Sequence, residues 1–154
     1  MKVNTRIAGA AFHPMTVLNA WEHFKHGADI GVRGIGFSRD AAFEQAALAL
    51  AAVVADPATI RSDTPIRIRC EAPDDELLLI DWLNALIYEM ATRPVLFNRF
   101  SVTIRERVLD AVAWGEPLDH ARHHPSIEVK GATYSELRVE HSGDRWVAQC
   151  VVDV

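Results

Sequence analysis

The sequence predicts an α+β fold in which two helices pack on a mainly antiparallel β-sheet within a single compact domain. Apolar residues recur at helical spacing in segments 41–54 and 77–91. Apolar and polar residues alternate in several other segments, and these strands outnumber the helices that could connect parallel strands. The length of 154 residues suits one domain, and 49% apolar with 24% charged residues is ordinary for a globular protein.

Residues 1–20 show no clear periodicity and are expected to form an N-terminal extension before a folded domain over 21–154. Residues 21–33 predict a short strand with a turn-like centre. The sequence GVRGIG at 31–36 is expected to form a tight bend, because glycine adopts turn conformations readily. It does not match the GxGxxG pattern of dinucleotide-binding loops.

Both helices have recognisable start and stop signals. Ser38 is a favourable N-cap for the first helix, and Asp56-Pro57 is expected to end it. The second helix follows an acidic run at 74–76, whose charges suit a helix N-terminus, and ends at Thr92-Arg93-Pro94. Its predicted buried stripe consists of Leu79, Trp82, Leu83, Leu86, Ile87 and Met90.

The remaining segments predict strands and turns. Residues 66–71 alternate between apolar and charged side chains, which indicates a half-buried strand. Further strands are expected at 100–104, 109–114, 127–130, 134–140 and 146–154. Turns or loops are expected at 115–117, 120–125 and 141–144, the last of these closing a hairpin.

Composition excludes several classes of protein. The net charge of −5 argues against a dedicated nucleic-acid binder, so direct, stable nucleic-acid binding is not expected. With only Cys70 and Cys150, a disulfide framework or a cysteine zinc site is not expected either. No apolar run reaches the roughly 18 residues of a membrane span. These features predict a cytoplasmic protein without membrane contact.

A pair of carboxylates is the first candidate site. Asp29 lies between Gly27 and Gly31, where the uncrowded backbone allows close approach of a ligand. Asp153 stands beside the carboxyl end of the chain at Val154. Together, Asp29, Asp153 and a main-chain oxygen of Val154 would offer the hard oxygen ligands that suit Ca²⁺, Mg²⁺ or Mn²⁺. The alternative is that these carboxylates are simply solvated surface groups.

Two further clusters contain functional residue types. The segment HARHH at 120–124 places His123 among other histidines and Arg122, so it could bind zinc or an anion, although its spacing matches no zinc motif. Lys130 precedes Gly131-Ala132-Thr133-Tyr134 and could meet a phosphate or a carboxylate of a partner. A solvated loop and a solvated lysine remain the alternatives. No P-loop or GxSxG elbow is present, so the residues favour a binding or helper role over an enzyme.

Five sequence blocks, in order, resemble those of the archease family. Residues 22–31 resemble the family pattern H-T-A-D-[IV]-G, and residues 41–43 resemble the start of the helix that follows it. Residues 79–88 resemble L-x-D-W-L-N-x-L-[LI]-Y. Residues 115–134 resemble G-E…H…[IV]-K-A-x-T-Y, and residues 146–154 resemble W-x-A…D-[IV]. The resemblance therefore covers residues 21–154. In two departures, Gly27 replaces the threonine after the motif histidine, His26, and Gly131 interrupts the K-A pair after Lys130.

The resemblance implies a non-catalytic activator of an RtcB-type RNA ligase. Such a helper promotes GTP-dependent guanylylation and multiple turnover of the ligase in tRNA splicing or RNA repair. The family binds a divalent cation, Ca²⁺ in structures with Mg²⁺ or Mn²⁺ as alternatives, and its ligands correspond here to Asp29, Asp153 and Val154. By the same resemblance, Lys130, His26 and His123 are the expected functional or partner-contacting residues.

The sequence is also compatible with two other functions. The first is a general chaperone-like or regulatory protein-binding module, in which the carboxylates are merely structural. The second is a small metal-dependent hydrolase, which would need a metal with an open coordination position for water. The first predicts binding of unfolded clients, and the second predicts turnover by the isolated protein.

Overall fold

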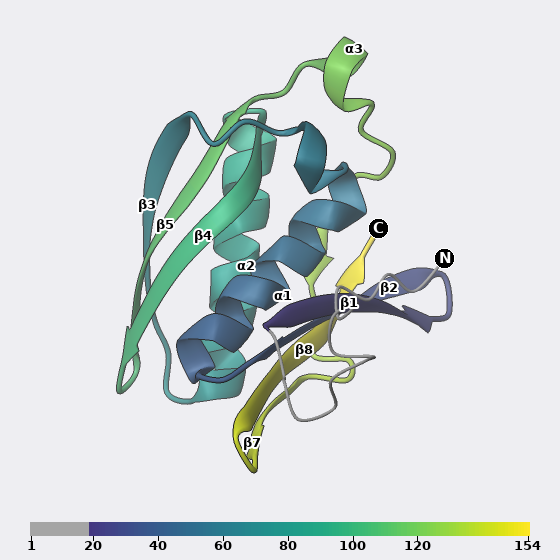
Figure 1. The fold of residues 1–154 in the computed structure, drawn as a ribbon. Helices are drawn as coiled ribbons and strands as arrows, with labels where there is room; N and C mark the ends of the chain where they lie inside the picture. The colour runs from purple at the N-terminus through teal and green to yellow at the C-terminus, as the bar shows by residue number, and fades with distance from the viewer. Residues whose placement is uncertain (1–18) are drawn as a thin grey trace, which may run out of the picture.

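The computed structural model describes residues 19–154, which fold into three layers. Two antiparallel sheets enclose a pair of helices (Figure 1). This confirms the predicted α+β class with two helices on antiparallel strands, and adds that the strands divide between two sheets. The predicted N-terminal extension lies largely outside the described residues, and Ala20 already begins the first strand. Within residues 19–154, no helix is long and apolar enough to cross a membrane.

The first sheet has the strand order β1-β2-β8-β6, with β7 pairing the same central strand β8. Its strands are β1 (Ala20–His26), β2 (Asp29–Gly36), β6 (Gly131–Ala132), β7 (Arg138–Ser142) and β8 (Arg145–Asp153). The second sheet has the order β3-β5-β4, with β3 (Thr64–Glu71), β4 (Val95–Arg105) and β5 (Val108–Pro117). Every strand pair is antiparallel.

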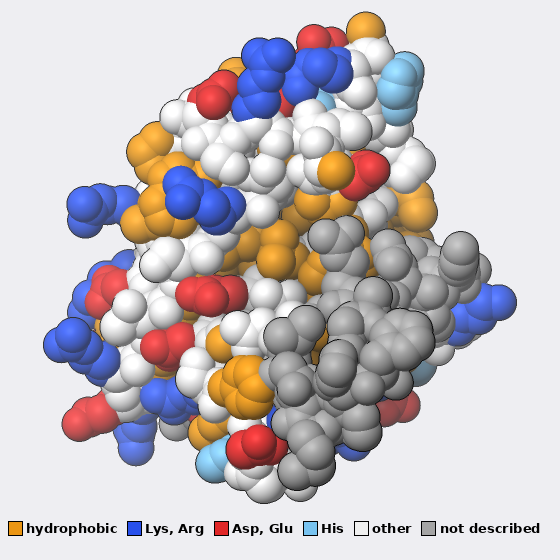
Figure 2. All heavy atoms as spheres, in the orientation of Figure 1, with side chains coloured by type: hydrophobic (Ala, Val, Ile, Leu, Met, Phe, Trp, Pro, Cys, Tyr) orange, Lys and Arg blue, Asp and Glu red, His pale blue; other side chains and the backbone are white. Residues whose placement is uncertain are grey.

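The helices lie between the sheets. They are α1 (Arg39–Val54) and α2 (Asp75–Thr92), with a single turn α3 (His120–His123) and a 3₁₀ turn η2 (Pro57–Thr59) outside the main layers. As predicted, the Ser38 side chain caps α1 by accepting a hydrogen bond from the Ala41 amide at 3.0 Å. Asp74 caps α2 in the same way, through the Leu77 amide at 2.8 Å. Figure 2 shows the same view as spheres, with charged side chains of both signs around the rim.

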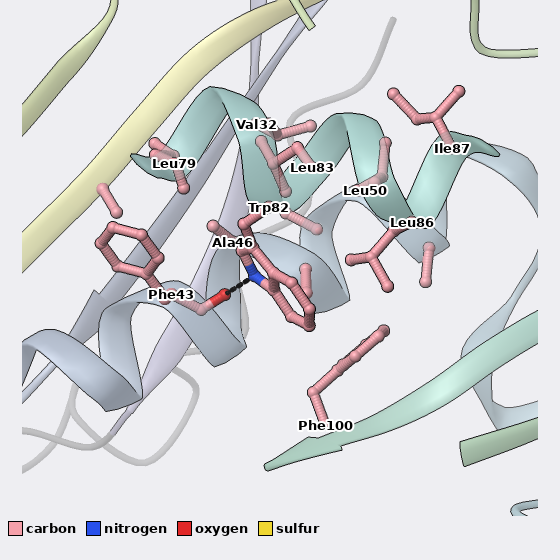
Figure 3. Close-up of a cluster of buried hydrophobic side chains, with 14 of the residues drawn as sticks. Val32, Phe43, Ala46, Leu50, Leu79, Trp82, Leu83, Leu86, Ile87 and Phe100 are labelled. Atoms are coloured by element: carbon pink, nitrogen blue, oxygen red, sulfur yellow. Dashed lines mark hydrogen bonds between the residues drawn. The ribbon is translucent and has the colours of Figure 1, made fainter. Parts of the chain in front are cut away.

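The core is centred on Trp82 of α2, which is fully buried. Its indole nitrogen donates a hydrogen bond to the main-chain oxygen of Phe43 in α1 at 3.1 Å, and its ring meets Phe100 edge-on at 6.0 Å between centroids (Figure 3). One side chain therefore joins both helices to the second sheet. The predicted apolar stripe of α2 is confirmed, with Met90 only partly buried.

The prediction of a tight bend at 31–36 is wrong, because these residues run straight through β2. A Cβ added at Gly34 would overlap main-chain atoms of α1, and even the third-nearest atom, Ala46 Cα, would lie 2.9 Å away. The glycine thus permits helix and strand to pack closely. The turn expected at 115–117 is also wrong: β5 continues to Pro117, and Gly115 lets the main chain of Leu96 approach.

Three other local predictions differ from the structure. The expected loop at 120–125 contains α3, capped by the side chain of Asp119. Residues 127–130 form no strand, and pairing begins only at Gly131. The strand expected at 134–140 begins at Arg138, because residues 133–137 leave regular pairing and Glu136 adopts a φ of 53°. The first of these segments is fixed by hydrogen bonds from α3 to Glu116 of β5, and the other two by contacts with β8 and α2.

Candidate functional site

Asp29 is placed by the hairpin that joins β1 to β2. His26 pairs with Asp29 across a loop of only Gly27 and Ala28. Gly27 has a φ of +59°, a left-handed conformation that glycine adopts at little cost, so this tight turn is available to the sequence. The turn fixes Asp29 as the first residue of β2, half-buried at one end of the first sheet.

The register between β2 and β8 brings the second carboxylate to the same place. Ile30 pairs with Val152, so the next step along both strands sets Asp29 opposite Asp153. Directly opposed residues in antiparallel strands point to the same face, with Cβ atoms about 4.5–5.5 Å apart. Because Ile30 and Val152 face the core, both aspartates lie on the outer face of the sheet. Asp153 is exposed there.

The end of the chain is held against this pair. The Val154 amide donates a hydrogen bond to Oδ1 of Asp29 at 3.4 Å. The Lys130 amide donates to the main-chain oxygen of Asp153 at 2.8 Å, and Gly131 pairs with Asp153 as β6 joins the sheet. The structure therefore brings together Asp29, Asp153, Val154 and Lys130, although they are far apart in the sequence. We call Asp29, Asp153 and Val154 the carboxylate site.

His26 belongs to the same region. It is exposed, and its pairing with Asp29 places it on the outer face of β1, in one row with Asp29 and Asp153. Three of the predicted residues thus lie across three neighbouring strands. The β1–β2 turn and the end of β8 lie close together in Figure 1, in agreement with this register.

The donor atoms at the carboxylate site fit a hard cation. Asp29 and Asp153 supply carboxylate oxygens, and Val154 supplies a main-chain oxygen. Neither aspartate forms an ion pair with a described side chain. No set of three His, Cys, Asp or Glu side chains in the same residues is placed to hold a metal ion. A cation here would therefore need oxygens of Val154 or of a partner.

His123 is not brought to this site. It is 3% exposed and lies in α3, well away from the end of β8 in Figure 1. Its Nδ1 accepts a hydrogen bond from the Asp119 amide at 2.9 Å, so Nε2 carries the proton and donates to Glu116 at 3.0 Å. The structure shows His123 as part of a buried polar cluster that joins α3 to β5.

Glu116 is the centre of that cluster and was missed by the sequence reasoning. Its carboxylate accepts hydrogen bonds from both terminal nitrogens of Arg122, from the Arg61 amide at 2.6 Å and from His123. The Arg122 guanidinium, with help from the other donors, holds the pKa of Glu116 well below its usual range. A glutamate at the end of a largely apolar strand, followed by Arg122 and His123, is the signal that could have revealed the cluster.

An apolar pocket of about 490 Å³ lies near the end of α2. Its wall is formed by the last turns of α2 and by the segment that links α3 to β6; among its lining residues are Ile87, Met90, Leu118, Ile127 and Val129. The pocket is distinct from the carboxylate site, although Val129 directly precedes Lys130 in the chain. Sequence reasoning did not predict it.

Comparisons with known proteins agree with this arrangement. The family model described as the Archease protein family matches residues 21–154. The protein archease of Pyrococcus furiosus is 38% identical over 142 residues, which cover 89% of this chain and 100% of that protein.

Solved structures show the same fold. The solution structure of Methanobacterium thermoautotrophicum protein 1598 is 28% identical, covers 87% of this chain and 98% of its own, and superposes with a TM-score of 0.77. The crystal structure of an archease from Thermotoga maritima, described as a possible chaperone, covers 85% of this chain and 94% of its own. At 19% identity and a TM-score of 0.54, that structure supports the fold alone. The family match over residues 21–154 and the extensive identity to the curated relative show that this chain belongs to the archease family.

Proposed function

We propose that this chain is a non-catalytic activator of an RtcB-type RNA ligase in the cytoplasm, where it promotes GTP-dependent guanylylation and multiple turnover in tRNA splicing or RNA repair. It acts through a divalent cation held at the carboxylate site. The main observation behind the proposal is that Asp29 and Asp153 lie opposite each other on β2 and β8, and that neither forms an ion pair with a described side chain. Membership of the archease family supports the choice of partner.

Electrostatics favours a cation between these strands. Two carboxylates with Cβ atoms about 4.5–5.5 Å apart repel each other unless a cation or water shares them. The hydrogen bond from the Val154 amide engages only Oδ1 of Asp29 and leaves Oδ2 available. Ca²⁺ accepts six to eight oxygens, and Mg²⁺ commonly keeps several ligand positions for water or phosphate. When bound, the ion would offer those open positions to phosphate or carboxylate oxygens of the ligase.

The surroundings suit contact with another protein. Lys130 is exposed and its main chain contacts that of Asp153, but it forms no ion pair with a described side chain, so its ammonium group can pair with an acidic group or phosphate of the ligase. His26 extends the same face by one strand. The site is an open strand end, and an enzyme site for a small substrate is more usually enclosed. This geometry favours an activating contact over catalysis by the chain itself.

Metal binding is tested directly by titration calorimetry of the whole chain with Ca²⁺ and with Mn²⁺. Asp29→Asn and Asp153→Asn each keep the side-chain shape and remove one charge, so both should abolish or strongly weaken binding. Asp144→Asn, in the exposed β7–β8 turn, removes the same charge away from the site and serves as the matched control. Equal binding by Asp29→Asn and the wild type would contradict the proposed site.

A second candidate function rests on the apolar pocket. A chaperone-like module would use that pocket and the exposed aromatic residues Tyr88 and Tyr134, which are 64% and 70% exposed, to hold unfolded clients. Suppression of aggregation of an unrelated unfolded protein, without any effect on repeated ligation by the RNA ligase, would favour this candidate. Stimulated ligation without client protection would favour the activator.

A further inference from the structure

The outer face of the second sheet carries regular rows of arginine side chains. Strand alternation turns Ile66, Ile68, Leu109 and Val102 toward the core. The opposite face is therefore formed by the intervening residues of β3, β5 and β4. The pairing sets these residues in four rows: Glu71, Val108 and Arg105; Arg69, Asp110 and Thr103; Arg67, Val112 and Ser101; Pro65, Trp114 and Arg99.

The charge of this face opposes the charge of the whole chain. The four rows contain four arginines and two acidic residues, whereas the chain as a whole has a net charge of −5. Only Arg69 is neutralised locally, through an ion pair with Asp110 at 3.0 Å. Arg67, Arg99 and Arg105 form no ion pair with the described residues. Figure 2 shows blue side chains along the left edge of the molecule, where Figure 1 places this sheet.

A stacking platform and a hollow accompany the arginines. The Arg99 guanidinium lies 3.9 Å from the centre of the Trp114 ring. A shallow hollow of about 400 Å³ occupies the middle rows, lined by residues that include Arg67, Ser101 and Thr103. The hydroxyl groups of Ser101 and Thr103 have no hydrogen-bond partner among the described residues. The face thus offers guanidinium donors, hydroxyl groups and an aromatic ring side by side.

We propose that this face binds single-stranded RNA, with phosphates on Arg67, Arg99 and Arg105 and a base stacked against the Arg99–Trp114 pair. Arg99 and Arg105 are six residues apart on β4, about 20 Å at roughly 3.4 Å per residue, a span that an extended strand of several nucleotides can follow. Sheets that bind single strands combine aromatic stacking with a positive surface in this way. The expectation of no nucleic-acid binding came from the net charge, which averages over both faces.

An RNA is favoured over an acidic protein by the aromatic ring and the shallow hollow. An acidic polypeptide would use the guanidinium groups but has no base to place against Trp114. The proposal goes beyond the proposed activation of the ligase, since the two outer faces point away from each other with the helices between them. Binding of RNA by this chain is measured without any ligase, so either proposal can fail without the other.

The test is fluorescence anisotropy of the whole chain with a labelled oligouridylate of about 12 nucleotides. Each phosphate contact on a single strand contributes a slope of about −0.7 in log K against log salt, so three contacts predict a slope of about −2. Affinity should then fall about 20-fold between 50 and 200 mM salt. Absence of saturable binding at 50 mM salt would overturn the proposal.

Matched variants locate the contacts. Arg67→Ala, Arg99→Ala and Arg105→Ala should each weaken binding about eightfold at 50 mM salt and reduce the slope by about 0.7. Arg145→Ala removes an equally exposed arginine from the first sheet and should leave the slope unchanged. Equal losses for Arg145→Ala and Arg67→Ala would show attraction by charge alone and contradict a specific face.

Two further measurements separate RNA from acidic protein. Trp114→Leu keeps an apolar side chain on β5 but removes the stacking surface, so RNA binding should weaken at least about fivefold. Circular dichroism of this variant verifies that it folds. Polyglutamate of matched charge should compete poorly with the RNA. Competition as strong as that of unlabelled RNA would mean that the face recognises acidic polypeptides, which would overturn the proposal.

Discussion

Gly34→Ala is expected to destabilise this protein far more than an ordinary glycine-to-alanine change in a strand. Gly34 lies in β2, directly beneath α1. An added Cβ would overlap the main-chain oxygen of Ala42 and the main-chain nitrogen of Ala46. Main-chain atoms within a helix cannot rotate aside as a side chain can, so the helix and the strand must separate.

The size of the effect follows from two opposing contributions. Overpacking in a core costs about 1–3 kcal/mol, and the upper end applies here because the atoms overlapped belong to the main chain. Alanine also restricts the unfolded chain, which offsets about 0.4–1 kcal/mol. The net loss of unfolding free energy should therefore be about 2 kcal/mol, which corresponds to a fall in Tm of about 4–8 °C at this chain length.

Gly131→Ala is the matched control, because Gly131 also lies in the first sheet but has room for a methyl group. The nearest atom to its added Cβ is Asn84 Oδ1 at 3.8 Å, an ordinary contact. This variant should be as stable as the wild type or up to about 1 kcal/mol more stable. Urea unfolding followed by circular dichroism compares all three proteins. If Gly34→Ala unfolds within about 0.5 kcal/mol of the wild type, the account of close helix–strand packing is wrong.

Three further predictions concern the core, a helix end and pH. Trp82→Leu should cost about 2–4 kcal/mol, because it leaves a cavity and removes the hydrogen bond to Phe43; a loss below about 1 kcal/mol in urea unfolding would contradict this. Ser38→Ala should cost about 1 kcal/mol by loss of the α1 cap, whereas Ser38→Asp should retain most stability in the same assay. Because folding lowers the pKa of Glu116, its ionised carboxylate stabilises the fold at pH values above the ordinary pKa of 4.5. This stabilisation is lost as the pH falls below 4.5 toward the pKa in the folded protein. Glu116→Gln should therefore melt below the wild type at neutral pH, with a gap that narrows at acid pH; a constant gap would refute the linkage.

The sequence predicted those elements whose signal is local. The periodicity of α1 and α2, the Ser38 cap and the alternation of β3 all depend on residues a few positions apart, and all are confirmed. Two glycines were wrongly predicted to lie in turns, because their role depends on contacts that are distant in the sequence. Gly34 and Gly115 accommodate main chain that is distant in sequence, and nothing in the local pattern distinguishes this role from a turn.

The prediction of the carboxylate site also had a part that the sequence could supply and a part that only the fold could supply. The residue types and the family resemblance singled out Asp29, Asp153 and Val154, but only the register of β2 with β8 sets the two aspartates opposite each other. For His123, the motif contained no information about burial or about the hydrogen-bond partner. Its position after Gly115-Glu116 predicted a functional histidine, and the structure adds that it is buried against Glu116. The division of the strands into two sheets is a long-range property and was not predicted either.

The measurement that tests the central claim most directly is the rate of GTP-dependent guanylylation of the cognate RtcB-type ligase in Mn²⁺, with and without this protein. The wild type and Asp144→Asn should accelerate the reaction equally. Asp29→Asn and Asp153→Asn should fold normally and fail to accelerate it, because each weakens the cation site at the end of β8. Full acceleration by both site variants, or none by the wild type with an active ligase, would contradict the claim that these carboxylates activate the ligase.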